Sequence, residues 1–193
     1  KMKDFSKEDI KQRLIDGNNR YVTDKESLIS DKELRSSLQE GQSPFAIILS
    51  CADSRVVPEC VFDQGMGDLF VLRVAGNIAG DRVIGSIEYA VENLGCRLIV
   101  VLGHEKCGAV SATLGENDPG GHMSYLVEHI KPAVERAKGM EGDLLTNSVK
   151  MNAKLEAEQL AAKDPYISKR VQDLGVQIVP AYYKLSNGEV EFM

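Results

Sequence analysis

The sequence predicts a single α/β domain with a central, mostly parallel β-sheet flanked by helices, an antiparallel edge strand near the C-terminus and an N-terminal helical arm. Two observations predict this class. Short, continuous apolar runs at 45–49 and 98–102 are typical of strands buried on both faces, as in parallel sheets. Strand, helix and strand also follow one another over 69–102, which is a βαβ unit whose crossover forces parallel pairing.

The first 40 residues predict a helical arm. Apolar periodicity predicts helices over 6–22 and 31–39, although Gly17-Asn18-Asn19 interrupts the pattern of the first. The arm has few apolar partners of its own, so we expect residues 1–40 to pack on the body of the domain or on a partner subunit. Residues 1–193 are expected to form one domain, because a chain of this length supports one full core.

The remaining elements follow from apolar runs and from residues that start or stop helices. Strands are expected at 45–50, 69–74, 97–102, 176–179 and 189–192, and helices after Pro58 and at 81–94, 107–114, 123–138, 144–163 and 165–174. Pro132 predicts a kink or break near Ile130 in its helix. Ser186-Asn187-Gly188 predicts a turn into the last strand, which we expect to be the antiparallel edge.

Composition narrows the classes of partner. The net charge of −6 provides no basic footprint for nucleic acid, and no apolar run approaches the roughly 20 residues of a membrane helix, so we expect neither partner. No apolar segment of a signal peptide follows the N-terminus, so we expect a cytoplasmic protein; a leader removed before Lys1 stays an open alternative. Four cysteines are too few for a disulfide scaffold in a chain this long.

Three soft metal ligands follow two of the predicted strands. Cys51 comes directly after one strand, and His104 and Cys107 follow the strand at 97–102. The carboxyl ends of parallel strands meet at one edge of a sheet, so these side chains can converge. Zinc prefers thiolate and imidazole, and a catalytic zinc keeps three protein ligands and one open position. We expect one zinc ion per chain; the alternative is two core cysteines beside a helix-capping histidine.

Asp53 and Arg55 lie beside the first of these ligands and are close enough in sequence to pair. A carboxylate and a guanidinium next to a metal ligand are candidates for a catalytic role. The alternative is a surface ion pair, which contributes little to stability.

Cys-Ala-Asp-Ser-Arg at 51–55 and Gly-His-Glu-Lys-Cys-Gly at 103–108 together resemble the paired zinc motifs of the β-class carbonic anhydrases. The similarity extends from about Ser6 to Phe192. It implies a zinc lyase that interconverts carbon dioxide and bicarbonate, built as a homodimer or a dimer of dimers.

The resemblance also implies roles for single residues. Arg55 would hold Asp53 away from the metal, and Asp53 would orient the attacking hydroxide. The substrate pocket, shared across a subunit boundary, would be lined by Gln42, Phe70, Ala75, Tyr89 and Gly108. Plain core or interface packing is the alternative for the two aromatic residues. The chain has no Trp, so it is more similar to the members that lack a second, regulatory bicarbonate site.

Two other functions stay open. One is a hydrolase of carbonyl sulfide or carbon disulfide on the same scaffold, which would differ in its pocket. The other is a non-catalytic, zinc-stabilised binding protein, which would be expected to lose Asp53 or Arg55 or to fill the fourth metal position with protein.

The ligand set predicts a rising pH profile. Two thiolates cancel the formal charge of zinc, which makes it a weaker Lewis acid than zinc held by three neutral histidines. We expect hydration activity to climb from about pH 7 to about pH 9, because water on such a zinc ionises above the usual value of about 7. Stopped-flow assays in buffers that keep proton transfer fast measure this, and a flat profile would contradict it.

Overall fold

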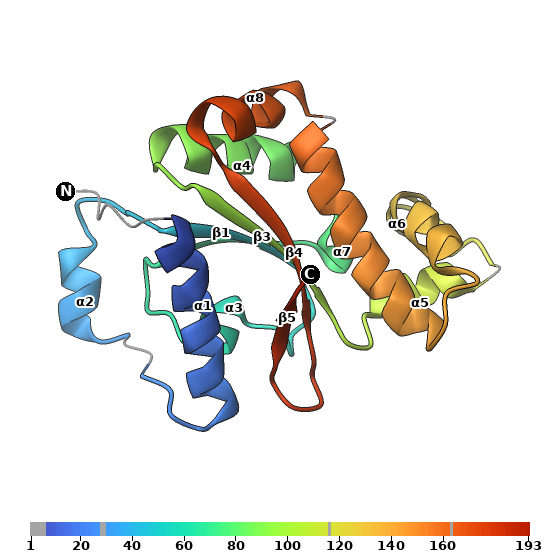
Figure 1. Cartoon of the computed structure of the whole chain (residues 1–193), viewed down its shortest axis with the longest axis horizontal. Helices are drawn as coiled ribbons and strands as arrows, with labels where there is room; N and C mark the ends of the chain where they lie inside the picture. The colour runs from blue at the N-terminus through green and yellow to red at the C-terminus, as the bar shows by residue number, and fades with distance from the viewer. Residues whose placement is uncertain (1–6, 28–29, 116, 163) are drawn as a thin grey trace.

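Five strands form one sheet in the order β2-β1-β3-β4-β5 in the computed structural model, which describes residues 7–27, 30–115, 117–162 and 164–193 (Figure 1). The strands are β1 (Ala46–Ser50), β2 (Leu69–Arg73), β3 (Leu98–His104), β4 (Gln177–Tyr183) and β5 (Val190–Phe192). The first four pair in parallel and β5 pairs antiparallel with β4. The α/β class and the antiparallel edge are therefore confirmed.

Helices cover both faces of this sheet. They are α1 (Lys7–Val22), α2 (Lys32–Ser37), α3 (Pro58–Val61), the 3₁₀ turn η1 (Ala75–Asn77), α4 (Asp81–Asn93), α5 (Gly108–Leu114), α6 (Met123–Ala137), α7 (Leu144–Ala162) and α8 (Pro165–Leu174). Apolar residues of α1 and α3 pack on one face with Ile48, and those of α4, α7 and α8 pack on the other with Ile47 (Figure 1). Adjacent residues of β1 thus face two cores, which explains the continuous apolar run.

The helix expected over 6–22 is confirmed, and α1 continues through Gly17-Asn18-Asn19, the polar triplet that interrupts its apolar pattern. A Cβ atom on Gly17 would lie 1.8 Å from the carbonyl oxygen of Phe62, so glycine allows α1 to approach the body closely. The buried Asn18 amide donates to the carbonyl oxygens of Val61 (3.0 Å) and Gly188 (2.8 Å). The polar triplet is therefore where α1 docks on its own body. Packing of the arm on a partner subunit stays a prediction.

Two expectations about proline need correction. The break near Ile130 is wrong, because α6 continues through Pro132; burial of Ile130, Ala133 and Val134 on its inner face offsets the roughly 3 kcal/mol that an interior proline costs. A kink there stays a prediction. β4 does not stop at residue 179 but continues through Pro180 to Tyr183. Proline is tolerated there because the edge strand β5 pairs only with residues 181–183.

The four cysteines are free, as their number led us to expect. Within the described ranges, no helix has both the length and the apolar character needed to cross a membrane.

Gly17→Ala is expected to lower the free energy of unfolding by roughly 3 kcal/mol, because the new methyl group collides with the backbone of Phe62. Gly85→Ala is the matched control. Gly85 also lies inside a helix, α4, but a Cβ there meets nothing within 4 Å, so alanine should stabilise by about 1 kcal/mol. Denaturant titration of both variants in the same metal-loading state measures this. Equal stability of the two would refute the close docking of α1.

Candidate metal centre

Parallel pairing brings the ends of β1 and β3 together. Ser50 is the register partner of Leu102, and β3 continues two residues further to His104. Cys51 follows β1 directly, so it lies beside this extension. Lys106, with φ of 54°, turns the chain so that Cys107 comes back toward the strand ends. Cys107 is the N-cap of α5, not part of its first turn as the sequence suggested.

The three predicted ligands converge. One ligand atom each from Cys51, His104 and Cys107 lies within 4.8 Å of the other two, and all three residues are buried. Cys60 and Cys96 do not join this cluster, because Cys60 lines a separate cavity and Cys96 packs in the core against α4. Three soft donors at tetrahedral-site spacing are a set that zinc accepts.

Backbone contacts fix the orientation of the His104 ring. Its Nδ1 lies 2.9 Å from the carbonyl oxygen of Glu105. A carbonyl oxygen only accepts, so Nδ1 carries the proton and Nε2 keeps its lone pair. Nε2 is fully buried and has no hydrogen-bond partner among the described residues. A buried acceptor without a partner is costly, and a metal ion would satisfy it.

The two thiols share a proton. The hydrogen bond from Cys107 lowers the pKa of Cys51 to about 4 against the effect of burial. The neighbouring Cys51 thiolate, together with burial, raises the pKa of Cys107. The backbone N–H of Gly76 also donates to Cys51 Sγ over 3.4 Å. Thiol ligands must be deprotonated to bind a metal, so a divalent cation favours loss of the protons from both sulfurs.

Asp53 and Arg55 form a bidentate pair beside the donors. Arg55 Nε and Nη2 donate to the two carboxylate oxygens of Asp53 over 3.0 and 2.8 Å, and its backbone N–H adds a third bond of 3.0 Å. The Arg55 side chain holds the pKa of Asp53 below its usual range, so this carboxylate is ionised. Asp53 Oδ2 lies 3.8 Å from His104 Nε2, which places a fixed negative charge at the edge of the donor cluster.

Arg73 holds the backbone of the same loop, and sequence reasoning missed it. Its Nε donates to the carbonyl oxygen of Cys51 (3.1 Å) and its Nη2 to that of Asp53 (2.6 Å). The only signal was its place at the end of β2, where the parallel register sets it opposite Ser50. One guanidinium therefore positions both the ligand and the catalytic carboxylate candidate.

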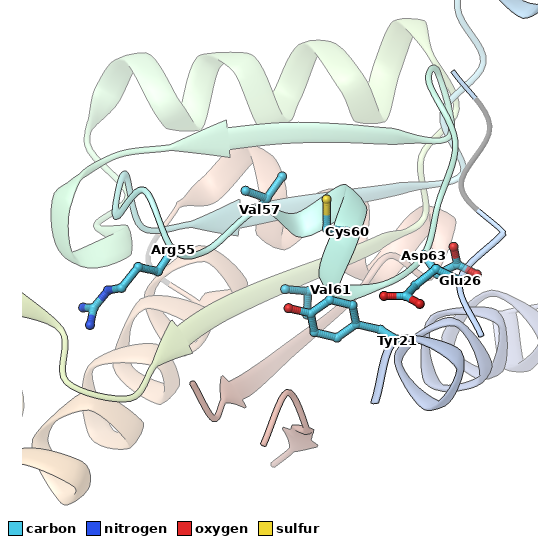
Figure 2. A pocket seen from close by; sticks show the side chains of 7 residues that line it. All are labelled: Tyr21, Glu26, Arg55, Val57, Cys60, Val61 and Asp63. Carbon is cyan, nitrogen blue, oxygen red and sulfur yellow. The ribbon is translucent and has the colours of Figure 1, made fainter. Parts of the chain in front are cut away.

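A cavity of about 440 Å³ lies on the α1 and α3 side of the sheet. It is lined by the seven side chains that Figure 2 labels, including Tyr21, Arg55 and Cys60, and none of the three metal donors is among them. Figure 2 shows the Arg55 guanidinium pointing away from Cys60 and Val61. The cavity is thus separate from the donor cluster, although Arg55, which lines it, also pairs with Asp53 beside the donors.

A family model described as carbonic anhydrase matches residues 46–190, and this match includes all three donors and the Asp53–Arg55 pair. The chain belongs to the β-class carbonic anhydrase family. The general activity of that family is the hydration of carbon dioxide.

Curated relatives and solved structures agree with this membership. The chain is 40% identical to "Carbonic anhydrase 2" of Mycobacterium tuberculosis, over 91% of this chain and 87% of that one. It is 38% identical to the carbonic anhydrase of Mycolicibacterium smegmatis, with coverage of 92% and 89%. Among solved structures, a tetrameric β-carbonic anhydrase from Sordaria macrospora superposes with a TM-score of 0.77 at 22% identity, with coverage of 84% and 87%, and supports the fold alone.

The pocket residues expected of a β-class carbonic anhydrase divide into two groups. Ala75 opens η1 next to Gly76, and Gly108 opens α5 directly after Cys107, so both lie beside the donors.

The other three pocket residues lie away from the donors. Phe70 is the register partner of Ile47. Ile47 precedes Cys51 by four residues, which corresponds to about 13 Å along the strand. The half-exposed Tyr89 lies with its ring 6.4 Å from that of Phe70. Gln42 is exposed and precedes β1. The last three are not brought to the donors of their own chain.

Arg73→Met is expected to lower the affinity for zinc by roughly 10–100-fold, because the methionine keeps the apolar stem but loses both carbonyl contacts that orient Cys51 and Asp53. Arg97→Met is the matched control. Arg97 also donates to two carbonyl oxygens, those of Val91 and Cys96, at 2.9 Å each, but away from the donors. Competition with a chromogenic chelator measures both affinities, and equal values would show that Arg73 has no role in the site.

Proposed function

We propose that this enzyme catalyses the reversible hydration of carbon dioxide to bicarbonate and a proton, with one zinc ion held by Cys51, His104 and Cys107. The observation that carries the proposal is the buried cluster of two thiol sulfurs and one imidazole nitrogen within 4.8 Å, whose Nε2 has no protein partner among the described residues. A zinc ion bound there supplies hydroxide at neutral pH by lowering the pKa of water toward about 7.

Asp53 is the proposed catalytic residue. Its carboxylate is ionised and stands 3.8 Å from His104 Nε2, so it can accept a hydrogen bond from the attacking hydroxide and orient a lone pair toward carbon dioxide. Arg55 positions it, since the bidentate pair leaves the carboxylate little freedom to approach the donors itself. The paired state therefore favours access of substrate to the metal.

We further propose a homodimer or dimer of dimers in which Gln42, Phe70 and Tyr89 line the site of the partner subunit. Support comes from their separation from the donors of their own chain and from the exposure of Tyr89, which is 48%. Ala75 and Gly108 would complete the pocket from the metal side. A single domain over residues 1–193, an arm at 1–40 on the partner, and a cytoplasmic location remain predictions.

The two alternatives have less support. A non-catalytic binding protein has no need of an ionised carboxylate clamped beside an open donor cluster, yet Asp53 and Arg55 are both present and paired. Nothing in the described residues favours carbonyl sulfide or carbon disulfide over carbon dioxide, so substrate comparison decides between those chemistries.

Asp53→Ala is expected to keep about one zinc per chain but to lower the rate of carbon dioxide hydration by about 100-fold or more, because the hydrogen-bond acceptor that orients the hydroxide is lost. Asp68→Ala is the matched control: this carboxylate also pairs with an arginine, Arg13, at 2.9 Å, but does not adjoin the donors. Zinc analysis and stopped-flow hydration measure the effect. A folded parent protein without zinc and without activity would overturn the proposal, and faster turnover of carbonyl sulfide would favour the hydrolase.

A further inference from the structure

The loop after β2 contacts one of the donors through its backbone. Gly76 lies in η1 with φ of 71° and ψ of 14°, and its N–H donates to Cys51 Sγ over 3.4 Å. A Cβ atom at this position would lie 2.6 Å from Ile130 Cδ1 of α6, so only glycine fits. The position of the Ala75–Gly76 peptide group decides whether the Gly76 N–H forms its hydrogen bond to the Cys51 sulfur.

Two buried polar side chains of α7 hold the same loop. Asn152 is 1% exposed, and its Nδ2 donates to the carbonyl oxygen of Gly76 over 2.8 Å. Glu156, one turn further along, is 2% exposed and accepts from the backbone N–H of Ala79 over 2.8 Å. The spacing of four residues puts both on one face of the helix. α7 therefore forms hydrogen bonds with the loop on both sides of Asn77.

Burying an amide and a carboxylate is costly unless each forms hydrogen bonds. Most other buried positions of α7, including Val149, Ala153 and Leu160, are apolar, so packing against the body of the domain does not by itself require an amide and a carboxylate here. Hydrogen bonds depend on direction, so these two side chains fix the orientation of the Gly76 carbonyl and the Ala79 N–H in the loop. Asn152 contacts the very residue whose N–H reaches Cys51.

We propose that Asn152 is a positioning residue of the metal site, which holds Gly76 so that its N–H donates to the Cys51 sulfur and limits how strongly this thiolate donates to the metal. The inference rests on the proposed zinc site. A hydrogen bond to a thiolate withdraws electron density from the sulfur lone pairs, and such outer contacts both orient a ligand and tune the metal. Asn152 thus acts through Gly76 and touches neither the metal nor the substrate.

Asn152→Leu tests the proposal, because leucine has a similar volume but donates no hydrogen bond. We expect zinc affinity, measured by chelator competition, to fall by roughly 10–100-fold, because the loop that orients Cys51 is no longer held and this loss outweighs the stronger donation of the freed sulfur. In the cobalt-substituted protein we expect the sulfur-to-cobalt charge-transfer band to move to longer wavelength, since the sulfur lone pairs rise in energy. A residue that merely supports the fold would change stability without moving this band.

Ser148→Ala is the matched control. Ser148 lies one turn before Asn152 on the same buried face of α7, and its Oγ has no hydrogen-bond partner among the described residues. This variant should keep both the affinity and the band of the parent. If Asn152→Leu matches Ser148→Ala in both measurements, the proposal is overturned.

Two outcomes distinguish a failure of this inference from a failure of the proposed function. A folded parent that binds neither zinc nor cobalt through its thiols would overturn the proposed function and this inference together. A parent that binds zinc and hydrates carbon dioxide, with Asn152→Leu unchanged, would overturn this inference alone. If Asn152→Leu does not fold, NMR of the cadmium-loaded parent and of the smaller substitution Asn152→Ala decides. A scalar coupling between the Gly76 amide proton and cadmium that is lost in Asn152→Ala supports the proposal, and a coupling equal to that of the parent overturns it.

Discussion

Parallel pairing of β1 with β3 is the constraint on which the rest of the site depends. The register from Ile47 with Ile99 to Ser50 with Leu102 fixes both strand ends at one edge of the sheet. Because side chains alternate along each strand, a slip of one residue would turn the donors to the opposite face. Every residue of β1 and β3 is buried, so close packing against both cores, and not an alternation of apolar and polar residues, holds this register. The cores thus specify the positions of Cys51 and His104 before any metal binds.

Backbone groups surround the donor cluster as closely as side chains do. The Glu105 carbonyl sets the tautomer of His104, the Gly76 N–H meets the Cys51 sulfur, and Arg73 holds the Cys51 and Asp53 carbonyls. Backbone atoms move less than long side chains, so this arrangement gives the donors a rigid frame. The orientation of the donors therefore also depends on residues outside 51–55 and 103–108, such as Arg73 and Gly76.

The sequence was sufficient for the fold class, the strand-end donors and the Asp53–Arg55 pair, because each depends on short-range pattern: apolar runs, strand ends and residue types that zinc prefers. It was insufficient where a contact runs through the backbone. Arg73 and Asn152 bind carbonyl oxygens, which every residue has, so their side chains leave no spacing to recognise. Packing likewise decided two details that local pattern left open, with Gly17 against Phe62 and Pro132 in a helix whose inner face is buried.

Asn18 joins the two ends of the chain. Its side chain bonds to Gly188 and accepts from the Val190 N–H over 2.9 Å, across a separation of 172 residues. Contacts at such separation form late, because the chain between them must first be ordered. During synthesis, which proceeds from the N-terminus, α1 can contact Val61 and Phe62 early, but the part of its surface that binds the β4–β5 turn stays uncovered until that turn has been made. Docking of α1 is therefore completed only once β4 and β5 have been made.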